Sequence, residues 1–307
     1  MSRRALLKSW ALAGAALALD SRSATAANRD QRASALEHAA APLAPPPPKE
    51  SIATAFVIAK DAEVIDFVGP WEVFQDVSVP GRVDPPFRLY TVAESIAPVK
   101  VSGGLSIVPD YTFDQAPQPQ LIVVPAFEST PAALDWIRSA SKAATLTMSV
   151  CSGALVLADA GLLAGRSATT FHSNLTSLAA EHPEISVKRG VRFVDDGRVS
   201  TSAGILSGID LALHVIERYF GRAVAAQRAW DLELLSAAWK DPSLNAPYAR
   251  RPRLTGAHPR CPVCEYAFSD EELAAAPHEV YKGKTYHFCS AEDQARFDRS
   301  PDRYAER

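Results

Sequence analysis

Cys151 stands where the chain could present a reactive thiol. It follows an apolar run, residues 145–150, and precedes a stretch of helical period that opens with Ser152 and Gly153. A thiol at such a strand-to-helix turn lies beside the unpaired N–H groups of a helix, which favour its anion. We therefore expect Cys151 to be a nucleophile with a lowered pKa, largely thiolate at neutral pH. A buried, inert cysteine is the alternative that the local sequence leaves open.

The segments around Cys151 alternate between two patterns. Short apolar runs rich in β-branched residues are followed by segments of helical period, which predicts a parallel sheet with helices on both faces. The predicted strands are residues 52–59, 87–93, 120–125, 145–150 and 198–202. The predicted helices are residues 70–75, 131–141, 152–160, 174–182, 205–219 and 223–239. This order is typical of an α/β fold with a nucleophile elbow.

The N-terminus is predicted to be an export signal. Arg3 and Arg4 precede an apolar stretch at residues 10–19, and Ala24-Thr25-Ala26 supplies a cleavage site. The paired arginines resemble a twin-arginine signal, which implies a periplasmic protein exported in the folded state. The apolar stretch is shorter than the roughly 20 residues that span a bilayer, so we expect no stable membrane insertion after signal removal.

Composition shifts divide the rest of the chain. We expect a signal peptide at residues 1–26, an Ala/Pro-rich linker at 27–50, a main domain at 51–246, a second linker at 247–257 and a small module at 258–307. About 50 residues bury little core, so the module needs a metal or a docking surface. The net charge of −3 and the absence of a helix-turn-helix pattern argue against nucleic acid as a partner.

Four stretches of the main domain, in order, resemble the ThiJ/PfpI family and its isonitrile hydratase-like branch. They are residues 64–74 (VIDFVGPWEVF), 101–105 (VSGGL), 149–170 (SVCSGALVLADAGLLAGRSATT) and 201–210 (TSAGILSGID). The resemblance covers residues 52–238. It implies a flavodoxin-like parallel-sheet sandwich, a small-molecule substrate, no cofactor in the main domain and a homodimer.

The resemblance also implies roles for three residues. Cys151 would attack the isonitrile carbon, Asp66 would be the acid/base and Ser152 would supply a hydroxyl, giving an N-substituted formamide through a thioimidate. An isonitrile carbon must accept a nucleophile, a proton and then water, which a thiol and a carboxylic acid can manage. The alternative for Asp66 is a cap at the start of a helix.

Two departures from the family concern auxiliary residues. The family's glycines are replaced by Ala126 and Phe127, which could reshape or close part of the pocket. The next residue, Glu128, is either an additional carboxylate near Cys151 or, as we favour, a helix cap. His172 is displaced by one residue from the family's histidine, so a Cys-His dyad is an alternative to an ordinary surface or core histidine. We expect His214 to be structural.

The C-terminal module resembles a YHS domain, a family associated with metal binding. The resemblance rests on residues 261–264 (CPVC), on residues 280–290 (VYKGKTYHFCS) and on Phe297 and residues 301–304. Cys264 and Cys289 match the family's cysteines, whereas Cys261 stands where the family commonly has Asp. Zinc or another soft metal would suit a site made of the thiols of Cys261, Cys264 and Cys289. The fourth ligand would be His287 or Asp293. A disulfide between two of the three cysteines is the alternative.

Three functions fit this sequence. A cysteine-dependent hydro-lyase of the isonitrile hydratase type is favoured. A ligand sensor or binding protein is the second, because this branch also serves as the sensing part of AraC-type regulators. A redox or metal-stress protein is the third, with oxidation of Cys151 and metal capture by the module as its outputs.

Overall fold

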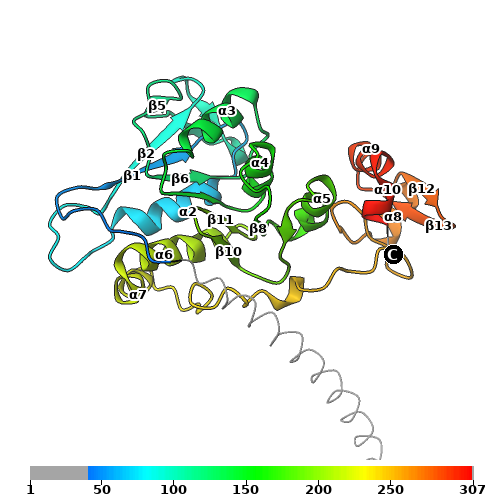
Figure 1. Ribbon diagram of the computed structural model, residues 1–307. Helices are drawn as coiled ribbons and strands as arrows, with labels where there is room; N and C mark the ends of the chain where they lie inside the picture. The colour runs from blue at the N-terminus through cyan, green and yellow to red at the C-terminus, as the bar shows by residue number, and fades with distance from the viewer. Residues whose placement is uncertain (1–40, 306–307) are drawn as a thin grey trace, which may run out of the picture. The chain divides into compact units, whose positions relative to one another are not determined.

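The main domain is built on a seven-stranded sheet (Figure 1). The computed structural model describes residues 41–305, so the predicted signal peptide and residues 27–40 of the predicted linker lie outside the described residues. The strands of the sheet are β1 (Ile52–Val57), β2 (Phe87–Ala93), β5 (Tyr111–Thr112), β6 (Leu121–Val124), β7 (Leu146–Ser149), β10 (Phe193–Asp196) and β11 (Val199–Ser202). Their order is β10-β11-β7-β6-β1-β2-β5, and every neighbouring pair except β10–β11 is parallel.

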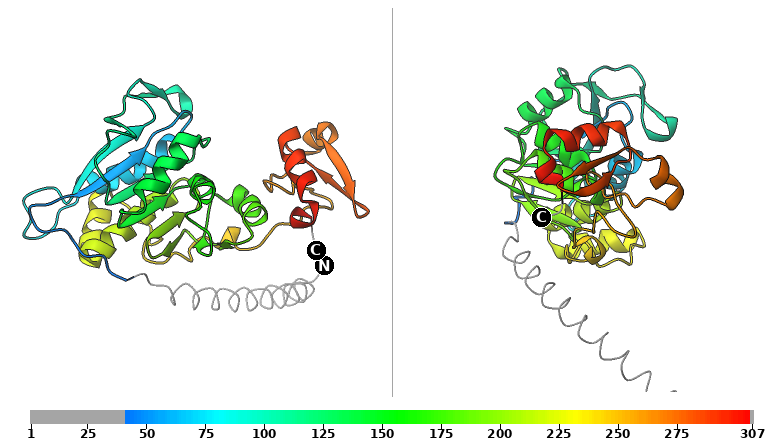
Figure 2. Two further views of the ribbon diagram at one scale, coloured as in Figure 1. Left: turned by 45° about the horizontal axis from the view of Figure 1, so that its top comes forward. Right: turned by 90° about the vertical axis from the view of Figure 1, so that its right-hand side faces the viewer.

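Helices cover both faces of this sheet, as Figure 2 shows from two further directions. They are α2 (Val64–Gln75), α6 (Ser207–Phe220) and α7 (Arg222–Asp231) on one face, and α3 (Pro131–Ala140) and α4 (Gly153–Asp159) on the other. Alternate residues of β1 show the division, because Ile52 and Phe56 belong to one core cluster and Ala55 and Val57 to the other. The predicted α/β sandwich is confirmed for the main domain.

The described elements differ from the predicted ones at α2, α7 and β10 and at short strands that were not predicted, namely β5, β3 (Val99–Lys100), β4 (Ser106–Ile107), β8 (Ser167–Ala168) and β9 (Ser186–Val187). Helix α2 begins at Val64 and carries Pro70 in its interior, whereas the sequence predicts a start at Pro70. Helix α7 ends at Asp231, earlier than residue 239. Strand β10 was not predicted, because two of its four residues are aspartates, which are depleted in strands. Asp195 on β10 pairs with His214 (2.8 Å) and Arg218 (3.1 Å), so His214 is structural, as expected.

Residues 41–50 lie along the main domain. The backbone N–H of Leu43 donates to the carbonyl of Arg218 (2.8 Å), and Arg82 donates to the carbonyls of Pro46 (3.0 Å) and Pro47 (3.1 Å). This part of the predicted linker is therefore bound to the domain and is not a free spacer. Prolines leave carbonyls available without offering N–H groups, which explains why an arginine binds them.

The C-terminal module packs against the main domain through helix α5 (Leu175–Glu181). The module contains the hairpin β12 (His278–Tyr281) and β13 (Lys284–His287) with the helices α8 (Asp270–Ala275), α9 (Ala291–Arg299) and α10 (Pro301–Tyr304). Ala180 of α5 belongs to the same buried cluster as the module's aromatic residues Tyr286, Phe288, Phe297 and Tyr304. Ser177 donates to the carbonyl of Val263 (3.1 Å), and Arg189 pairs with buried Glu265 (2.6 Å). The module thus has the docking surface that its small size requires.

Short elements connect these parts. They are β3 (Val99–Lys100) with β4 (Ser106–Ile107), β8 (Ser167–Ala168) with β9 (Ser186–Val187), and the 3-10 turns η1 (Ser102–Gly104), η2 (His172–Asn174) and η3 (Ala246–Tyr248). Among the residues described, no helix combines the length and apolar character that crossing a membrane requires.

Candidate active site

Cys151 occupies a strained turn between β7 and α4. Its φ angle is +57°, in the left-handed region that non-glycine residues seldom adopt. Surrounding bonds hold this conformation, because the N–H of Cys151 donates to Ala203 (3.0 Å) and its carbonyl accepts from the hydroxyl of Thr170 (2.9 Å). The sequence prediction of a nucleophile elbow therefore agrees with the backbone. The strain falls on the cysteine itself, and not on Ser152 or Gly153.

Gly153 permits α4 to approach the end of β6. A Cβ atom built there would lie 2.3 Å from the carbonyl oxygen of Val124 and 2.8 Å from that of Pro125. Backbone atoms at such distances must shift, which is why only glycine fits at this position.

Replacing Gly153 by Ala should lower the free energy of unfolding by about 3 kcal/mol, because the added methyl group overpacks the α4–β6 contact. Urea denaturation measures this loss. Gly204→Ala is the matched control, since its Cβ would meet Phe171 at an ordinary 3.4 Å. Equal midpoints for the two variants would contradict this explanation of Gly153.

The surroundings of the Cys151 thiol favour its neutral form. The residue is 6% exposed. Burial, followed by the negative charge of Asp66, raises the pKa of Cys151 to about 12, although the Ser152 hydroxyl lowers it. The expected lowering of the pKa is thus wrong. A helix N-terminus stabilises a nearby anion by roughly 0.3–1 kcal/mol, which lowers a pKa by less than one unit. Burial raises the pKa of Cys151 by more than this.

Asp66 is fully buried and lies in the first turn of α2. Its Oδ2 accepts a hydrogen bond from the N–H of Ala126 (3.0 Å), and its buried Oδ1 has no hydrogen-bond partner among the described residues. Burial raises the pKa of Asp66 to about 7, with a smaller contribution from the charge of Glu63. The capping alternative is not supported, because Glu63 occupies the N-cap and Asp66 bonds to a different loop.

Ser152 lies next to the thiol and is held from a second element. Its Oγ is 3.8 Å from the Sγ of Cys151 and accepts a hydrogen bond from the Nδ2 of Asn174 (2.6 Å). Asn174 was not predicted to be a site residue. A polar residue 22 positions away from Ser152 carries no local signal of this contact.

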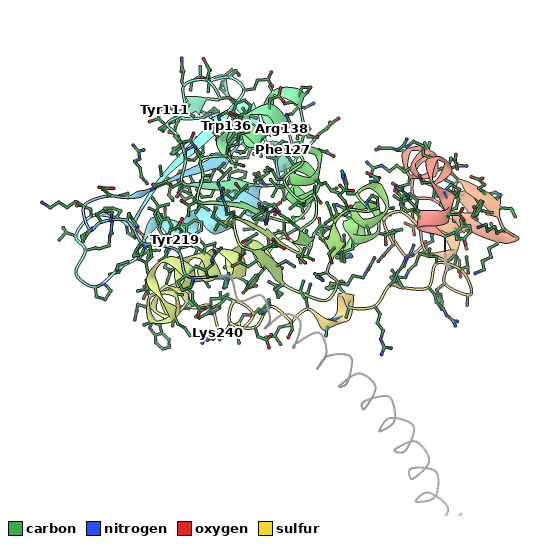
Figure 3. All side chains as sticks on the ribbon, in the orientation of Figure 1. Tyr111, Phe127, Trp136, Arg138, Tyr219 and Lys240 are labelled. Carbon is green, nitrogen blue, oxygen red and sulfur yellow. The ribbon has the colours of Figure 1, made fainter. Side chains whose placement is uncertain are left out.

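In the loop after β6, both backbone groups of Ala126 are engaged in hydrogen bonds. The N–H of Ala126 donates to Asp66, and its carbonyl accepts from the N–H of Glu63 (2.9 Å). Phe127 packs against both core clusters, on the α3 side of the sheet (Figure 3). Glu128 is exposed, and Thr130 caps α3, so the favoured capping role for Glu128 is wrong.

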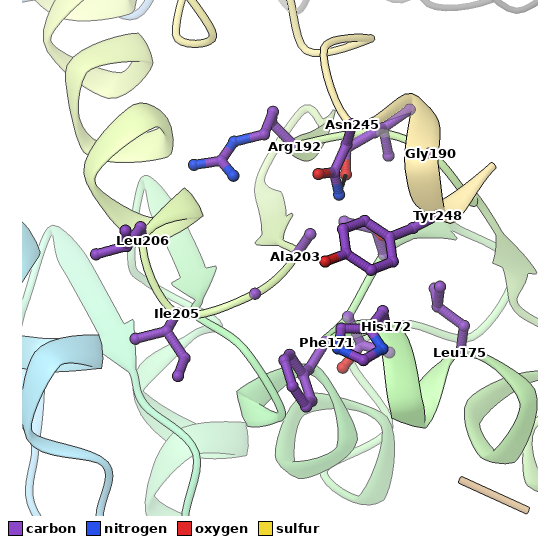
Figure 4. A pocket seen from close by; sticks show the side chains of 14 residues that line it. Phe171, His172, Leu175, Gly190, Arg192, Ala203, Ile205, Leu206, Asn245 and Tyr248 are labelled. Atoms are coloured by element: carbon purple, nitrogen blue, oxygen red, sulfur yellow. Dashed lines mark hydrogen bonds between the residues drawn. The ribbon is translucent and has the colours of Figure 1, made fainter. Parts of the chain in front are cut away.

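A cavity of about 240 Å³ (Figure 4) lies next to two backbone partners of Cys151, although Cys151, Ser152 and Asp66 are not among its lining residues. Thr170 and Ala203, which bond to the backbone of Cys151, belong to its lining. His172 also lines it, and its ring stacks on Tyr248 with centroids 4.7 Å apart. Burial lowers the pKa of His172, which keeps the ring neutral. His172 is thus part of an aromatic wall, together with Phe171.

The C-terminal cysteines form a compact donor cluster. One ligand atom from each of Cys261, Cys264, Cys289 and Asp293 lies within 4.8 Å of the others. The sulfurs of Cys264 and Cys289 are 3.3 Å apart, longer than the roughly 2.05 Å of a disulfide. Zn–S bonds of about 2.3 Å imply ligand separations of about 3.7 Å in a tetrahedron, so this donor set fits a soft metal ion.

His287 lies apart from this cluster. It is on β13, directly opposite His278, and the two rings are 5.6 Å apart. The structure therefore brings together the three predicted cysteines with Asp293, the second of the two expected fourth ligands, and not with His287.

Comparisons with known proteins agree with this geometry. A family model described as "DJ-1/PfpI family" matches residues 53–218. Isonitrile hydratase of Pseudomonas putida is 34% identical over 191 residues, which are 59% of this chain and 78% of that protein. The HTH-type transcriptional regulator CdhR of Pseudomonas aeruginosa is 32% identical over 146 residues, and this chain spans only 43% of its length.

Solved structures share the fold of the main domain. A ThiJ/PfpI family protein from Pseudomonas syringae superposes with a TM-score of 0.55 at 27% identity, covering 66% of this chain and 82% of that one. Drosophila melanogaster DJ-1beta superposes with a TM-score of 0.52 at 21% identity, covering 61% of this chain and all of that one. The second likeness concerns the fold alone.

Proposed function

The chain belongs to the DJ-1/PfpI family, and on that basis we propose that it is a cysteine-dependent hydratase of small isonitriles. The observation that carries the proposal is the buried pair of Cys151 and Asp66. A carboxyl group with a pKa of about 7 can both take and give a proton near neutral pH. The 34% identity to isonitrile hydratase supports the same reaction class.

Asp66 transfers the proton in the first half of the reaction, and the sulfur of Cys151 leaves in the second half. Because the resting thiol is protonated, Asp66 takes its proton as Sγ attacks the terminal isonitrile carbon. Asp66 then protonates that carbon, giving a thioimidate, R–N=CH–S–Cys151. Water adds to the thioimidate carbon, one of its protons passes to the nitrogen and the other returns to the departing sulfur. The products are the N-substituted formamide, the free thiol and the carboxylate.

We assign the substituent of the substrate to the cavity that is lined by Thr170 and Ala203, the backbone partners of Cys151. Its wall includes the aromatic rings of Phe171, His172 and Tyr248 and the apolar side chains of Leu175 and Ile205. A volume of about 240 Å³ accommodates a small group. We therefore favour small isonitriles with an apolar or aromatic substituent.

Peptide mass spectrometry tests the covalent step. After brief incubation with a simple isonitrile and an acid quench, the peptide that carries Cys151 should gain the mass of one isonitrile. Modification of Cys264 or Cys289 in its place would contradict the assignment of the nucleophile. An adduct on Cys151 that never yields formamide would favour the sensor function, which the match to CdhR also suggests.

We further propose that residues 258–307 bind zinc or another soft metal through Cys261, Cys264, Cys289 and Asp293. The support is the donor set, three sulfurs and one carboxylate within 4.8 Å of one another. A bound ion would tie the segment of Cys261 and Cys264 to Cys289 and to Asp293 of α9, and so stabilise a small core.

Protein purified from cytoplasm should contain about one metal ion per chain, because three thiolates bind soft divalent ions tightly. Elemental analysis should show loss of the metal in Cys264→Ser and a clear reduction in Asp293→Asn. His287→Asn is the matched control and should keep the metal. Metal-free protein with two fewer titratable thiols would establish the disulfide instead.

A further inference from the structure

Two residues at helix starts leave their helices uncapped. Ser152 is the N-cap of α4 and Asn174 is the N-cap of α5, and neither side chain bonds to its own helix. Serine and asparagine are among the best capping residues, but here both have helical backbone angles (φ −73°, ψ −3° and φ −100°, ψ −2°), so their side chains are available to other partners. The two side chains bond to each other, across 22 residues of sequence, at 2.6 Å.

The direction of this hydrogen bond determines what Ser152 can do. The amide Nδ2 of Asn174 is only a donor, so Ser152 Oγ accepts and keeps its single proton for another partner. The Sγ of Cys151 lies 3.8 Å away, within reach of a hydrogen bond to sulfur. The Ser152 O–H group can therefore point at the sulfur while the amide holds its oxygen.

We propose that Asn174 is a positioning residue of the active site, which orients the Ser152 hydroxyl as a hydrogen-bond donor to Cys151. The inference rests on the proposed function for its catalytic meaning. When Asp66 removes the thiol proton, the hydroxyl stabilises the negative charge on sulfur during attack. Without the amide, the hydroxyl rotates among other acceptors and this stabilisation is lost in part.

Alkylation of Cys151 by iodoacetamide measures this effect without any isonitrile. Peptide mass spectrometry follows the Cys151 peptide separately from the other cysteines, over a range of pH. Ser152→Ala should slow alkylation at pH 8 by about tenfold, because it removes a hydrogen bond to the reacting sulfur, and Asn174→Ala should slow it by about threefold, because it only misdirects that hydrogen bond. Ser173→Ala, at the neighbouring position, should leave the rate unchanged.

The double variant Ser152→Ala/Asn174→Ala distinguishes positioning from a general structural role. It should react at the same rate as Ser152→Ala alone, since Asn174 acts only through the hydroxyl. Additive losses in the double variant, or an unchanged rate in Asn174→Ala, would overturn the proposal.

Asn174→Asp provides a second route if the alanine variant folds poorly. An ionised carboxylate can only accept, so it should draw the Ser152 proton away from sulfur and slow alkylation as well. The same change in the Ser152→Ala background measures the effect of the added charge alone, and equal slowing in both backgrounds would overturn the proposal. Coupling between Ser152 and Asn174 in a protein that forms no formamide would refute the hydratase function and leave the positioning role standing.

Discussion

Cys151→Ser should reduce formamide production by about 10⁴-fold or more, the usual consequence of removing a nucleophile. Serine is nearly the same size as cysteine, so the strained turn and its bonds to Ala203 and Thr170 should persist. Its hydroxyl is a far weaker acid, and Asp66 cannot deprotonate it effectively. NMR of the reaction mixture quantifies the formamide directly.

Cys289→Ser is the matched control for this loss. Cys289 is exposed and belongs to the C-terminal cluster, far along the chain from the elbow. The control variant should hydrate isonitriles at the wild-type rate. If Cys151→Ser kept a rate within tenfold of wild type while Cys289→Ser lost activity, the nucleophile would be in the module and not at the elbow.

Asp66→Asn should lower turnover by about 10²- to 10⁴-fold, because the amide cannot exchange a proton with the thiol or the isonitrile carbon. The structure of the site should survive, since the Asn carbonyl oxygen can still accept the N–H of Ala126. Turnover at saturating isonitrile, compared with the wild type, measures the loss.

The same variant should be more stable than the wild type at pH 8. The pKa of Asp66 is raised from 3.8 to about 7 in the folded protein. The protonated Asp66 contributes fully to stability below about pH 4. This contribution is lost as the pH rises through about 7, because the buried carboxyl group then ionises. At pH 8 the buried charge opposes folding by an amount on the order of 4 kcal/mol, which the neutral amide avoids. Urea denaturation at pH 5 and pH 8 checks the sign.

The rate of Cys151 alkylation is a third measurement to make on Asp66→Asn. The carboxylate charge raises the pKa of the thiol, so its removal should lower that pKa and speed alkylation at pH 8. A catalytic role thus predicts slower turnover in a protein whose thiol is more reactive. Slower turnover together with slower alkylation and lower stability would indicate damage to the fold.

The fold was predictable because its signals are local. Strand β2 has the predicted bounds, Phe87–Ala93, since a run of apolar, aromatic and β-branched residues that is interrupted only by Arg88 specifies a largely buried strand. The elbow was predictable for the same reason, from an apolar run that leads into small residues. Strand β10 was not predictable, because Asp195 is stabilised by His214 and Arg218 of α6 and Asp196 by Arg166, all of them distant in sequence.

The site was predictable in residue identity but not in electrostatics. Cys151, Asp66 and Ser152 were identified by their motifs, whereas the pKa of Cys151 depends on burial and on the charge of Asp66, 85 positions earlier in the chain. Asn174 was missed for a similar reason, because its contact with Ser152 arises only from the tertiary arrangement that brings η2 to the elbow. Asp293 was one of two expected fourth ligands, and only the tertiary arrangement brings it to the sulfurs.

The most direct test is the conversion of a simple alkyl or aryl isonitrile by the purified wild-type protein, followed by NMR. If the protein is a hydratase, the isonitrile carbon signal will be replaced by that of the N-substituted formamide, with many turnovers per protein chain. Unchanged isonitrile in the presence of folded protein with an intact Cys151 thiol would contradict the proposed hydratase function.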